Sequence, residues 1–397
     1  MREGWKYQKL GELVKVINGL WVGKKPPFTN VAVVRNANFT KSCTLDMSNI
    51  AYIDVEEKQF NTRELQYADI IIEKSGGSEK QPVGRPVFFN IKDRGYSFSN
   101  FTATLRVVSS DIVPEYLYKV LLAQYKQGVT KRLQSKTTGL HNLDFKSYLK
   151  SVIPIPSCEK QLSIVSELDK ISELIRLKKE QLKDYDNLAQ SIFYEMFGDP
   201  VVNEKGWEVK KLGEVCECIT DGDHMPPPKS DTGIPFVTIG NVNKASRQID
   251  FDNTYFVPRD YFDNIPNIKK PRRGDVLYTV TGSYGIPIII NYDKEFCFQR
   301  HIGLLRPKVF MSPVFLCMWA LNDRTKGQAD MVATGIAQKT VSLKSLRNFA
   351  IILPPLPLQQ LFAQRIELIE QQKAEIQSTI ADLETLLASR MQYWFDQ

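Results

Sequence analysis

The sequence repeats itself once, with a period of about two hundred residues. The stretch WKYQKLGEL at residues 5–13 is matched by WEVKKLGEV at residues 207–215. Further short matches follow in the same order, at offsets between 196 and 206: Asn36–Asn38 with Asn241–Asn243, Ala68–Ile71 with Gly274–Leu277, Gly84–Val87 with Gly285–Ile288, Leu105-Arg106 with Leu305-Arg306, Thr138–Leu140 with Thr334–Ile336, and Phe145–Ser147 with Leu343–Ser345. Because this period is far longer than a solenoid unit, the repeat predicts two duplicated domains.

Each repeat consists of a globular part followed by a long helical segment. We expect a first domain at 1–157, a central helix at 158–198, a second domain at 199–356 and a C-terminal helix at 357–397. The globular parts mix short β-like runs with helical stretches, which indicates an α/β domain with a mixed or antiparallel sheet. The predicted fold class is therefore α+β, with two duplicated α/β domains that are each followed by a long helix.

Apolar residues recur every three or four positions through both helical segments, over four heptads or more. This spacing is typical of a coiled-coil seam. The alternative is that each helix lies only on its own domain. We expect the two helices to pair as an antiparallel coiled coil with pseudo-two-fold symmetry, through Ile164, Leu168, Ile171, Ile175, Leu182, Tyr185, Ile192, Ile369, Ile376, Ile380, Leu383 and Leu387.

Two lysines, Lys178 and Lys373, interrupt these seams. A charged residue at a core position lowers stability while fixing the register of a coiled coil. Alternatively, both side chains extend their ammonium groups out of the seam into water. The sequence leaves both interpretations open.

The net charge of +7 is unevenly distributed along the chain. The two globular segments carry +9 and +3, whereas the two helical segments carry −2 and −3. This separation favours an anionic partner for the domains and a protein partner for the helices. The N-terminal MREGW lacks the apolar core of a signal peptide, no apolar run approaches a membrane span, and the six cysteines include no CxxC pair. We therefore expect a cytoplasmic protein with no membrane partner.

The order of domain, proline-bounded helix, domain and helix resembles the specificity subunits of type I restriction-modification systems. The junction from Ile192 to Pro200, which continues to Glu214, is similar to that family, as are Gly274–Leu277, Gln299–Pro307 and Leu353–Gln360. The resemblance covers essentially the whole chain. The first repeat is the more divergent, with Asn100-Phe101 where the second has Arg300-His301.

This resemblance implies that the globular parts are target recognition domains and that the helices are spacers that dock methyltransferase subunits. It implies a complex with double-stranded DNA and two methyltransferase subunits, in which each domain reads one half of a bipartite asymmetric target. Restriction subunits would complete a host-defence nuclease that uses S-adenosylmethionine, ATP and Mg²⁺. The alternatives are a modification-only or type IIG-like system, or a coiled-coil adaptor without a DNA role.

Motifs that would support catalysis by the chain itself are incomplete. Lys25–Phe28 lacks the Asn or Asp that an adenine methyltransferase loop needs, and Gly19–Lys25 has the wrong spacing for a phosphate-binding loop. The three histidines are scattered without ligand spacing. We therefore expect no catalytic residue, no metal site and no cofactor bound by this chain.

Candidate DNA contacts are polar residues on Gly-, Asn- and Ser-rich loops, because such side chains read base edges and phosphates. For each of them, the alternative is a turn residue or a solvated charge. Asp69 and Asp275, by contrast, are expected to be structural, and Trp5 and Trp207 to anchor the core. The candidates are Lys24, Lys25, Arg35, Asn36, Asn38, Lys74, Ser75, Gly76, Lys136, Thr137 and Thr138 in the first domain, and Asp223, His224, Asn241, Asn243, Thr281, Gly282, Ser283, Tyr284, Arg300, His301, Thr334, Gln338 and Lys339 in the second.

Overall fold

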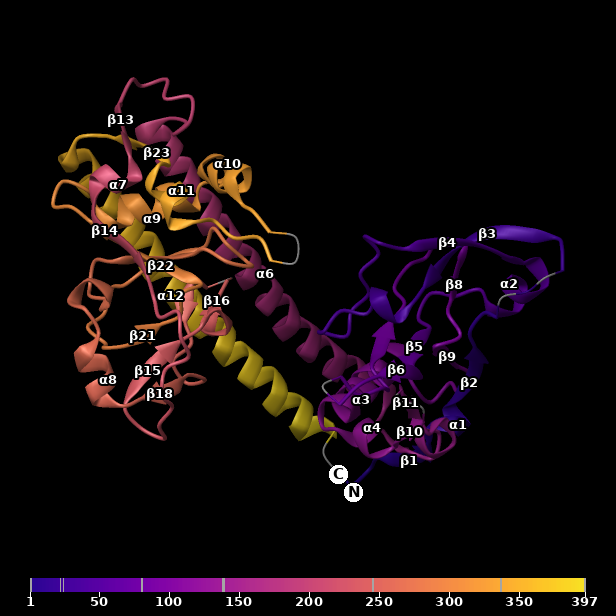
Figure 1. Ribbon diagram of the computed structural model, residues 1–397. Helices are drawn as coiled ribbons and strands as arrows, with labels where there is room; N and C mark the ends of the chain where they lie inside the picture. The colour runs from indigo at the N-terminus through magenta and orange to yellow at the C-terminus, as the bar shows by residue number, and fades with distance from the viewer. Residues whose placement is uncertain are drawn as a thin grey trace. The chain divides into compact units, whose positions relative to one another are not determined.

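The computed structural model divides the chain into two compact units (Figure 1). The first unit comprises Met1–Lys178 and Thr379–Gln397, and the second comprises Lys179–Ser378. Each unit therefore holds one globular domain and part of each long helix. The structure describes residues 2–21, 23, 25–79, 81–137, 140–244, 246–335 and 338–395, without the side chains of Lys136 and Thr137.

The first domain is built around a four-stranded antiparallel sheet and a three-stranded mixed sheet. The four-stranded sheet has the order β2 (Val14–Asn18), β9 (Thr102–Val107), β5 (Ile70–Glu73) and β7 (Pro86–Phe88). The mixed sheet has the order β4 (Ala51–Glu56), β3 (Phe28–Val34) and β8 (Tyr96–Phe98), of which β3 and β8 are parallel. Smaller sheets join β1 (Lys6–Lys9) to β12 (Val152–Ile155), and β10 (Gln134–Thr137) to β11 (Leu140–Leu143) and β6 (Ser75–Gly77). The helices are α1 (Leu10–Leu13), η1 (Asn36–Asn38), α2 (Glu57–Arg63), α3 (Pro114–Lys126), α4 (Val129–Arg132) and α5 (Phe145–Tyr148).

The second domain repeats this topology. Its four-stranded antiparallel sheet has the order β14 (Cys216–Asp221), β22 (Ile302–Pro307), β19 (Val276–Thr279) and β20 (Pro287–Ile289). Its mixed sheet has the order β18 (Tyr255–Val257), β15 (Ile234–Val237) and β21 (Cys297–Phe298), again with one parallel pair. Two-stranded sheets join β13 (Glu208–Lys211) to β23 (Ala350–Leu353) and β16 (Val242–Asn243) to β17 (Gln248–Ile249). The helices are α7 (Leu212–Val215), η2 (Ile239–Asn241), α8 (Arg259–Asn264), η3 (Asn267–Lys269), α9 (Pro313–Leu321), α10 (Asp323–Val332) and α11 (Leu343–Arg347). The duplication and the mixed sheet type are therefore confirmed.

One buried ion pair occurs in both domains. Arg106 donates from Nε and Nη2 to the carboxylate of Asp69 at 2.8 and 2.7 Å, and Arg306 binds Asp275 in the same way at 2.9 and 2.8 Å. Both carboxylates are 1% exposed. The two-pronged contact satisfies both oxygens, as a buried charge requires. The structural role predicted for the two aspartates is confirmed.

The structure corrects one match between the repeats. The sequence alignment paired Asn36 with Asn241, but Asn241 corresponds to Asn38. Asn38 Oδ1 accepts the backbone N–H of Arg35 and Asn241 Oδ1 accepts that of Thr238, in each case three residues earlier. The alignment missed the two-residue shift because both turns are rich in asparagine and valine or alanine.

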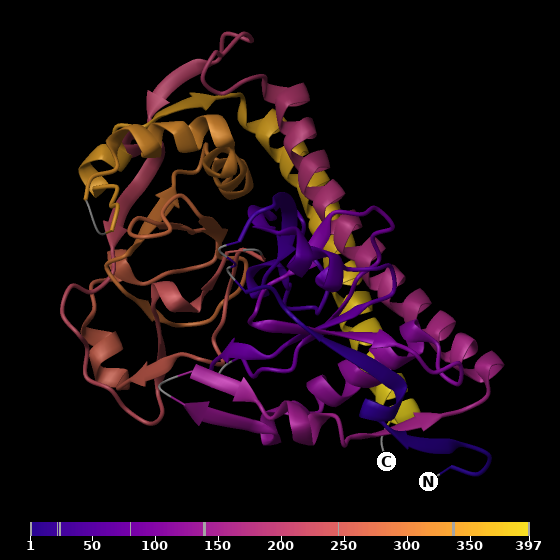
Figure 2. The same cartoon turned by 90° about the vertical axis from the view of Figure 1, so that its right-hand side faces the viewer.

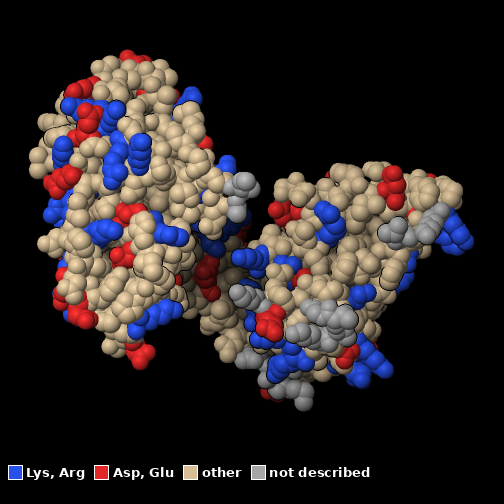
Figure 3. Space-filling view, in the orientation of Figure 1, with Lys and Arg blue, Asp and Glu red and all other residues tan. Residues whose placement is uncertain are grey.

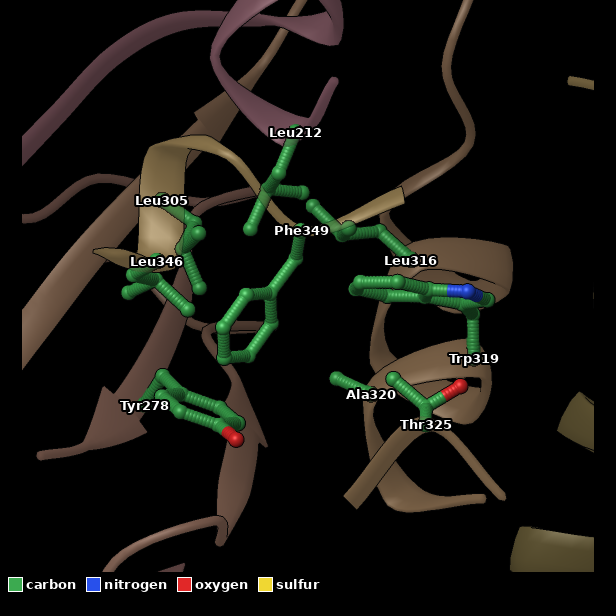
Figure 4. A pocket seen from close by; sticks show the side chains of 9 residues that line it. All are labelled: Leu212, Tyr278, Leu305, Leu316, Trp319, Ala320, Thr325, Leu346 and Phe349. Atoms are coloured by element: carbon green, nitrogen blue, oxygen red, sulfur yellow. The ribbon is translucent and has the colours of Figure 1, made fainter. Parts of the chain in front are cut away.

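The core of the second domain lies between the main sheet and the helices that cover it. Figure 4 shows side chains from α7, β19, β22, α9 and α11 converging around Phe349, among them Leu212, Tyr278 and Trp319. Trp319 is 1% exposed and is the largest fully buried side chain in the described chain. The gap between these side chains is too small for a water molecule, so this is packed core. Trp5 and Trp207 are only half-buried, at the edges of the cores that they were expected to anchor.

The two long helices are continuous: α6 covers Cys158–Phe197 and α12 covers Leu356–Phe395. Ser157 Oγ accepts the N–H of Lys160 and so caps the start of α6, and Gly198 follows the helix end with φ of +76°. Buried glutamines fix both helix starts. Gln161 accepts the N–H of Val113 and donates to two carbonyl oxygens, and Gln359 does the same with the N–H of Ser312.

Within each unit the two helices run antiparallel, and Figure 2 shows the second unit's segments of α6 and α12 side by side. In the first unit, Arg390 and Trp394 of α12 donate to Glu167 near the start of α6. In the second unit, Lys373 of α12 donates to Asp186 nearer the end of α6. Late residues of one helix thus meet early residues of the other, which confirms the predicted direction. All twelve predicted seam residues are buried or half-buried.

Candidate nucleic-acid interface

In the first domain, three of the predicted loops meet at one end of the four-stranded sheet. The strand β6, with Ser75 and Gly76, pairs with β11, and β11 pairs with β10. Asn36 Nδ2 donates to the carbonyl oxygen of Ser75 at 2.7 Å, which ties the η1 turn to the same place. Residues 35–38, 74–76 and 134–137, which are far apart in sequence, are therefore neighbours.

Lys74 connects this group to the loop that follows β2. Its Nζ donates to Asn18 Oδ1 at 3.1 Å, and burial lowers the pKa of its ammonium group. Lys25 is exposed, and its backbone N–H is held by Glu56 Oε1 at 2.7 Å. Lys24 and Thr138 lie outside the described residues, as do the side chains of Lys136 and Thr137.

The corresponding loops of the second domain are also brought together. The N–H of Gly282 donates to the carbonyl oxygen of Lys339 at 2.9 Å, and Thr281 bridges to Thr340. The N–H of Val280 donates to the carbonyl oxygen of His301 at 2.9 Å, just before the Thr281–Tyr284 loop. These contacts gather residues 281–284, 300–301 and 338–340 at the same end of the sheet as in the first domain.

The side chains of this second group differ in their exposure to solvent. Arg300, Thr334, Gln338, Lys339, Asn243 and His224 are exposed, whereas Ser283 and Tyr284 are half-buried. Tyr284 donates its hydroxyl to Asp330 at 2.7 Å, and Asp223 accepts the hydroxyl of Tyr261 at 2.8 Å. Burial and the neighbouring Arg300 lower the pKa of His301, which keeps its imidazole neutral near pH 7.

Two of the predicted contact residues belong to the interior. Asn38 and Asn241 are 2% and 7% exposed, and each uses its amide group within its own turn. Asn38 donates to the carbonyl oxygens of Asp46 and Asn49, and Asn241 donates to that of Asn253. With donor and acceptor both engaged in the interior, these side chains are not presented to a base edge. Their burial argues against the prediction that they contact DNA.

Sequence reasoning missed two residues of the same surfaces. Lys244 donates to Ser283 Oγ beside the Thr281–Tyr284 loop, and Phe101 is 45% exposed on the loop next to Lys74. A search for polar contact residues passes over aromatic side chains. The signal for Phe101 was its alignment with His301.

A buried ion pair between Glu73 and Arg85 stabilises the candidate loops of the first domain from the interior. Arg85 Nε donates to Glu73 at 3.1 Å, and its Nη groups donate to the carbonyl oxygens of Phe39 and Asn36. Burial raises the pKa of Glu73, and Arg85 opposes that effect. The second domain has Thr279 in place of Glu73, where its hydroxyl donates to the carbonyl oxygen of Ser283 at 2.7 Å. In both domains the residue at the same strand position thus stabilises the candidate loops. Glu73 does so through an ion pair and Thr279 through its hydroxyl group.

Charge alone does not outline these surfaces. On the face shown in Figure 3, Lys and Arg side chains alternate with Asp and Glu on both units. Within the described ranges, no three His, Cys, Asp or Glu side chains are placed to hold a metal ion. No described helix is long and apolar enough to cross a bilayer.

Comparisons with known proteins agree with this architecture. Residues 2–184 and 204–384 both match the family described as the type I restriction modification DNA specificity domain. The type I restriction enzyme MjaVIII specificity subunit of Methanocaldococcus jannaschii is 21% identical over 93% of this chain and 86% of that protein. The EcoBI specificity subunit of Escherichia coli is 22% identical over 52% of this chain and 40% of its own length.

Two solved structures have a similar fold. A chain of a solved type I restriction-modification assembly aligns over 99% of this chain and 98% of its own length, with a TM-score of 0.60 at 20% identity. The type I specificity subunit of M. genitalium aligns over 99% and 96%, with a TM-score of 0.52 at 13% identity. Because both halves match the family separately and the topology is duplicated in the same way, the chain belongs to the type I restriction-modification DNA specificity family.

Proposed function

We propose that this chain is the DNA-reading subunit of a type I restriction-modification complex and that each domain reads one half of an asymmetric, bipartite target. One observation carries the proposal: both domains gather the same set of loops at the same end of the same sheet, but with different side chains. A shared frame with variable loops is typical of recognition domains. Different loop chemistry in the two domains predicts different half-sites.

The contacts proposed for the second domain are the exposed residues Arg300, Gln338 and Lys339, together with His224 and the Thr281–Tyr284 loop. Arginine and glutamine can pair with guanine and adenine edges in the major groove, and lysine can neutralise phosphate. In the first domain the corresponding group is Lys25, Arg35, Ser75 and Gly76. The remaining predicted residues that are not buried stay candidates for the same role.

The helices carry a second apolar stripe that supports the docking of partner subunits. Leu174, Leu177 and Leu188 of α6 are 46–48% exposed, and Leu361, Leu368 and Leu386 of α12 are 45–63% exposed. Leu174 and Leu188 are two heptads apart, as are many partner-facing positions of helical bundles. Since each helix bears one stripe, we propose that two methyltransferase subunits dock on them.

The chemistry of such a complex would reside in its other subunits. In this proposal the chain has no catalytic centre and binds no cofactor. The methyltransferase subunits would use S-adenosylmethionine, and restriction subunits would add a nuclease that needs ATP and Mg²⁺. A cytoplasmic location follows from the same role.

The experiment that tests this function compares genome methylation with and without the gene for this chain. We expect one bipartite motif to lose its methylation on deletion and to regain it when the chain is supplied from a plasmid. Co-purification of the tagged chain with a methyltransferase subunit is the second readout. An unchanged methylation pattern together with no methyltransferase partner would contradict the proposal and favour an adaptor role.

A further inference from the structure

The turn that precedes β9 holds Phe101 in a fixed position among the candidate DNA-contacting loops. The N–H of Thr102 donates to the carbonyl oxygen of Ser99 at 3.0 Å, which closes a four-residue turn with Phe101 in its third position. The carbonyl oxygen of Phe101 accepts the N–H groups of Lys74 and Ser75 at 2.8 and 3.1 Å. The backbone of Phe101 is therefore fixed from two sides.

The side chain of Phe101 is nevertheless 45% exposed. Its ring lies close to Gly76, since a Cβ built on that glycine would be 4.0 Å from Phe101 Cδ1 and 3.2 Å from Asn36 Nδ2. The ring thus lies beside Gly76, Asn36 lies close to the same glycine, and Lys74 is bound to the backbone of Phe101. A single exposed apolar residue needs no explanation by itself. This one stands on a backbone that is held in place beside polar residues proposed to contact DNA.

The second domain has the same turn, but with polar side chains in place of the apolar one. The N–H of Ile302 donates to the carbonyl oxygen of Gln299 at 3.0 Å, and the carbonyl oxygen of His301 accepts the N–H of Val280. His301 therefore occupies the position of Phe101, and the exposed Arg300 occupies that of Asn100. The same rigid turn presents a cation and an imidazole in one domain and an aromatic hydrocarbon in the other.

The chemistry of base edges decides what such a ring can contact. Donors and acceptors dominate the edges in the major groove, and the only methyl group on them is the C5 methyl of thymine. A phenyl ring can form a favourable contact with that methyl group but cannot replace a hydrogen bond to any other base.

We propose that Phe101 is a specificity-determining residue of the first domain and that it contacts the methyl group of a thymine in the first half-site. This inference rests on the proposed function. It predicts that the half-site read by the first domain contains at least one thymine at a fixed position, on either strand. The second domain, with His301 in that place, has no such requirement from this turn.

Substitution of uracil for thymine tests the contact, because it removes only the methyl group. The chain is purified with its methyltransferase subunit, and its affinity is measured for duplexes in which each thymine of the first half-site is replaced in turn. At one position we expect the Kd of the native complex to rise about fourfold, the effect of one buried methyl group. Phe101→Ala should raise the Kd for the thymine duplex by a similar factor or more and abolish the difference between the two duplexes.

Matched controls separate this contact from general damage. Phe101→Leu retains an apolar side chain and should keep part of the discrimination, and His301→Ala should leave the uracil effect in the first half-site unchanged. The thermal midpoint of each variant reports whether it is folded. If a complex binds its target but discriminates at no thymine, or if its first half-site contains none, the inference about Phe101 is wrong. A complex that binds no specific target at all would instead contradict the proposed function.

Discussion

Two turns of identical role, one in each domain, use different residues at the same left-handed backbone position. Ala68 precedes β5 with φ of +72°, and Gly274 precedes β19 with φ of +90°. Both donate their N–H to the carbonyl oxygen of the residue that follows the neighbouring strand, Ala68 to Phe89 after β7 and Gly274 to Ile290 after β20. The Cβ of alanine makes this backbone conformation sterically unfavourable, whereas glycine adopts it without strain. The duplicated chain thus contains its own comparison of the two residues.

This comparison predicts that Ala68→Gly stabilises the first domain by about 0.5–1 kcal/mol. The reverse change, Gly274→Ala, should destabilise the second domain by about 1 kcal/mol, although its Cβ would meet only an ordinary contact at 3.8 Å from Pro313. Urea unfolding of the full chain, with hydrogen exchange read separately at β5 and β19, measures both. Opposite signs in the two domains are expected, and equal signs would contradict the argument.

At the scale of the helices, the seam lysine Lys373 has a defined environment in the second unit. Lys373 is 7% exposed, and its Nζ donates to Asp186 at 2.9 Å and to Glu370 at 2.8 Å. Arg247, from the loop between β16 and β17, reaches the same two carboxylates at 3.4 and 3.6 Å. The lysine is therefore not extended into water, and the register-fixing interpretation is favoured for Lys373. Lys178 is half-buried on the helix α6.

Removal of one carboxylate should weaken this helix pair. Asp186→Asn keeps the shape of the side chain but leaves Lys373 with one anionic partner, so we expect a loss of about 1–3 kcal/mol in unfolding free energy. Asp184→Asn, at an exposed position of the same helix, is the matched control and should change stability by less than about 0.5 kcal/mol. Thermal unfolding combined with light scattering reports both stability and any loss of the native pairing. An effect of Asp186→Asn no larger than that of the control would contradict a role in register.

The first unit's helix pair should depend on pH through Glu167. The hydrogen bond from Arg390 lowers the pKa of this carboxyl, and that from Trp394 adds to the effect. A carboxyl with a depressed folded-state pKa contributes stability above its unfolded pKa of about 4.3 and loses it as the pH falls through the folded pKa. We therefore expect Glu167→Gln to be less stable than the native chain at pH 6, with the difference shrinking toward pH 3. If the difference in stability between Glu167→Gln and the native chain did not depend on pH, Glu167 would act through packing and not through its charge.

At the scale of the whole molecule, the duplication makes the two domains separable units of recognition. Replacement of residues 199–356 by the corresponding segment of another specificity subunit should change one half of the methylated motif and leave the other half unchanged. The physical reason is that each set of loops is held by hydrogen bonds within its own domain. Methylome sequencing of the strain carrying the chimera is the measurement. A change in both halves would refute modular reading.

The helices should set the distance between the two half-sites. Deletion of one heptad from each helix at mid-length removes about 10 Å of helix, which corresponds to about three base pairs of DNA. We expect a target with an unread spacer shorter by about that number, or loss of binding, and the same assays distinguish these outcomes. A four-residue deletion from α6 alone is the control, since it shifts the seam by a part-heptad and should locally distort the pairing without a whole-heptad change of length. An unchanged spacer after the heptad deletion would contradict the spacer role.

The sequence by itself determined the duplication, the two helices, their antiparallel seam and the family. Each of these features follows from local periodicity or from ordered sequence similarity. Both can be recognised without knowledge of any tertiary contact. The structural roles of Asp69 and Asp275 were predictable for the same reason, because they recur at matched positions ahead of buried strands.

Only the tertiary structure decided which loop residues face outward. Asn38 and Asn241 were predicted to contact DNA, but their side chains form hydrogen bonds within their own turns. Phe101 became a candidate because the structure places its turn beside Lys74 and Gly76. Lys373 likewise pairs with Asp186, 187 positions away in the chain, and Arg247 from a separate loop binds the same carboxylates. Burial depends on long-range packing, and no local pattern of asparagine, lysine or phenylalanine encodes it.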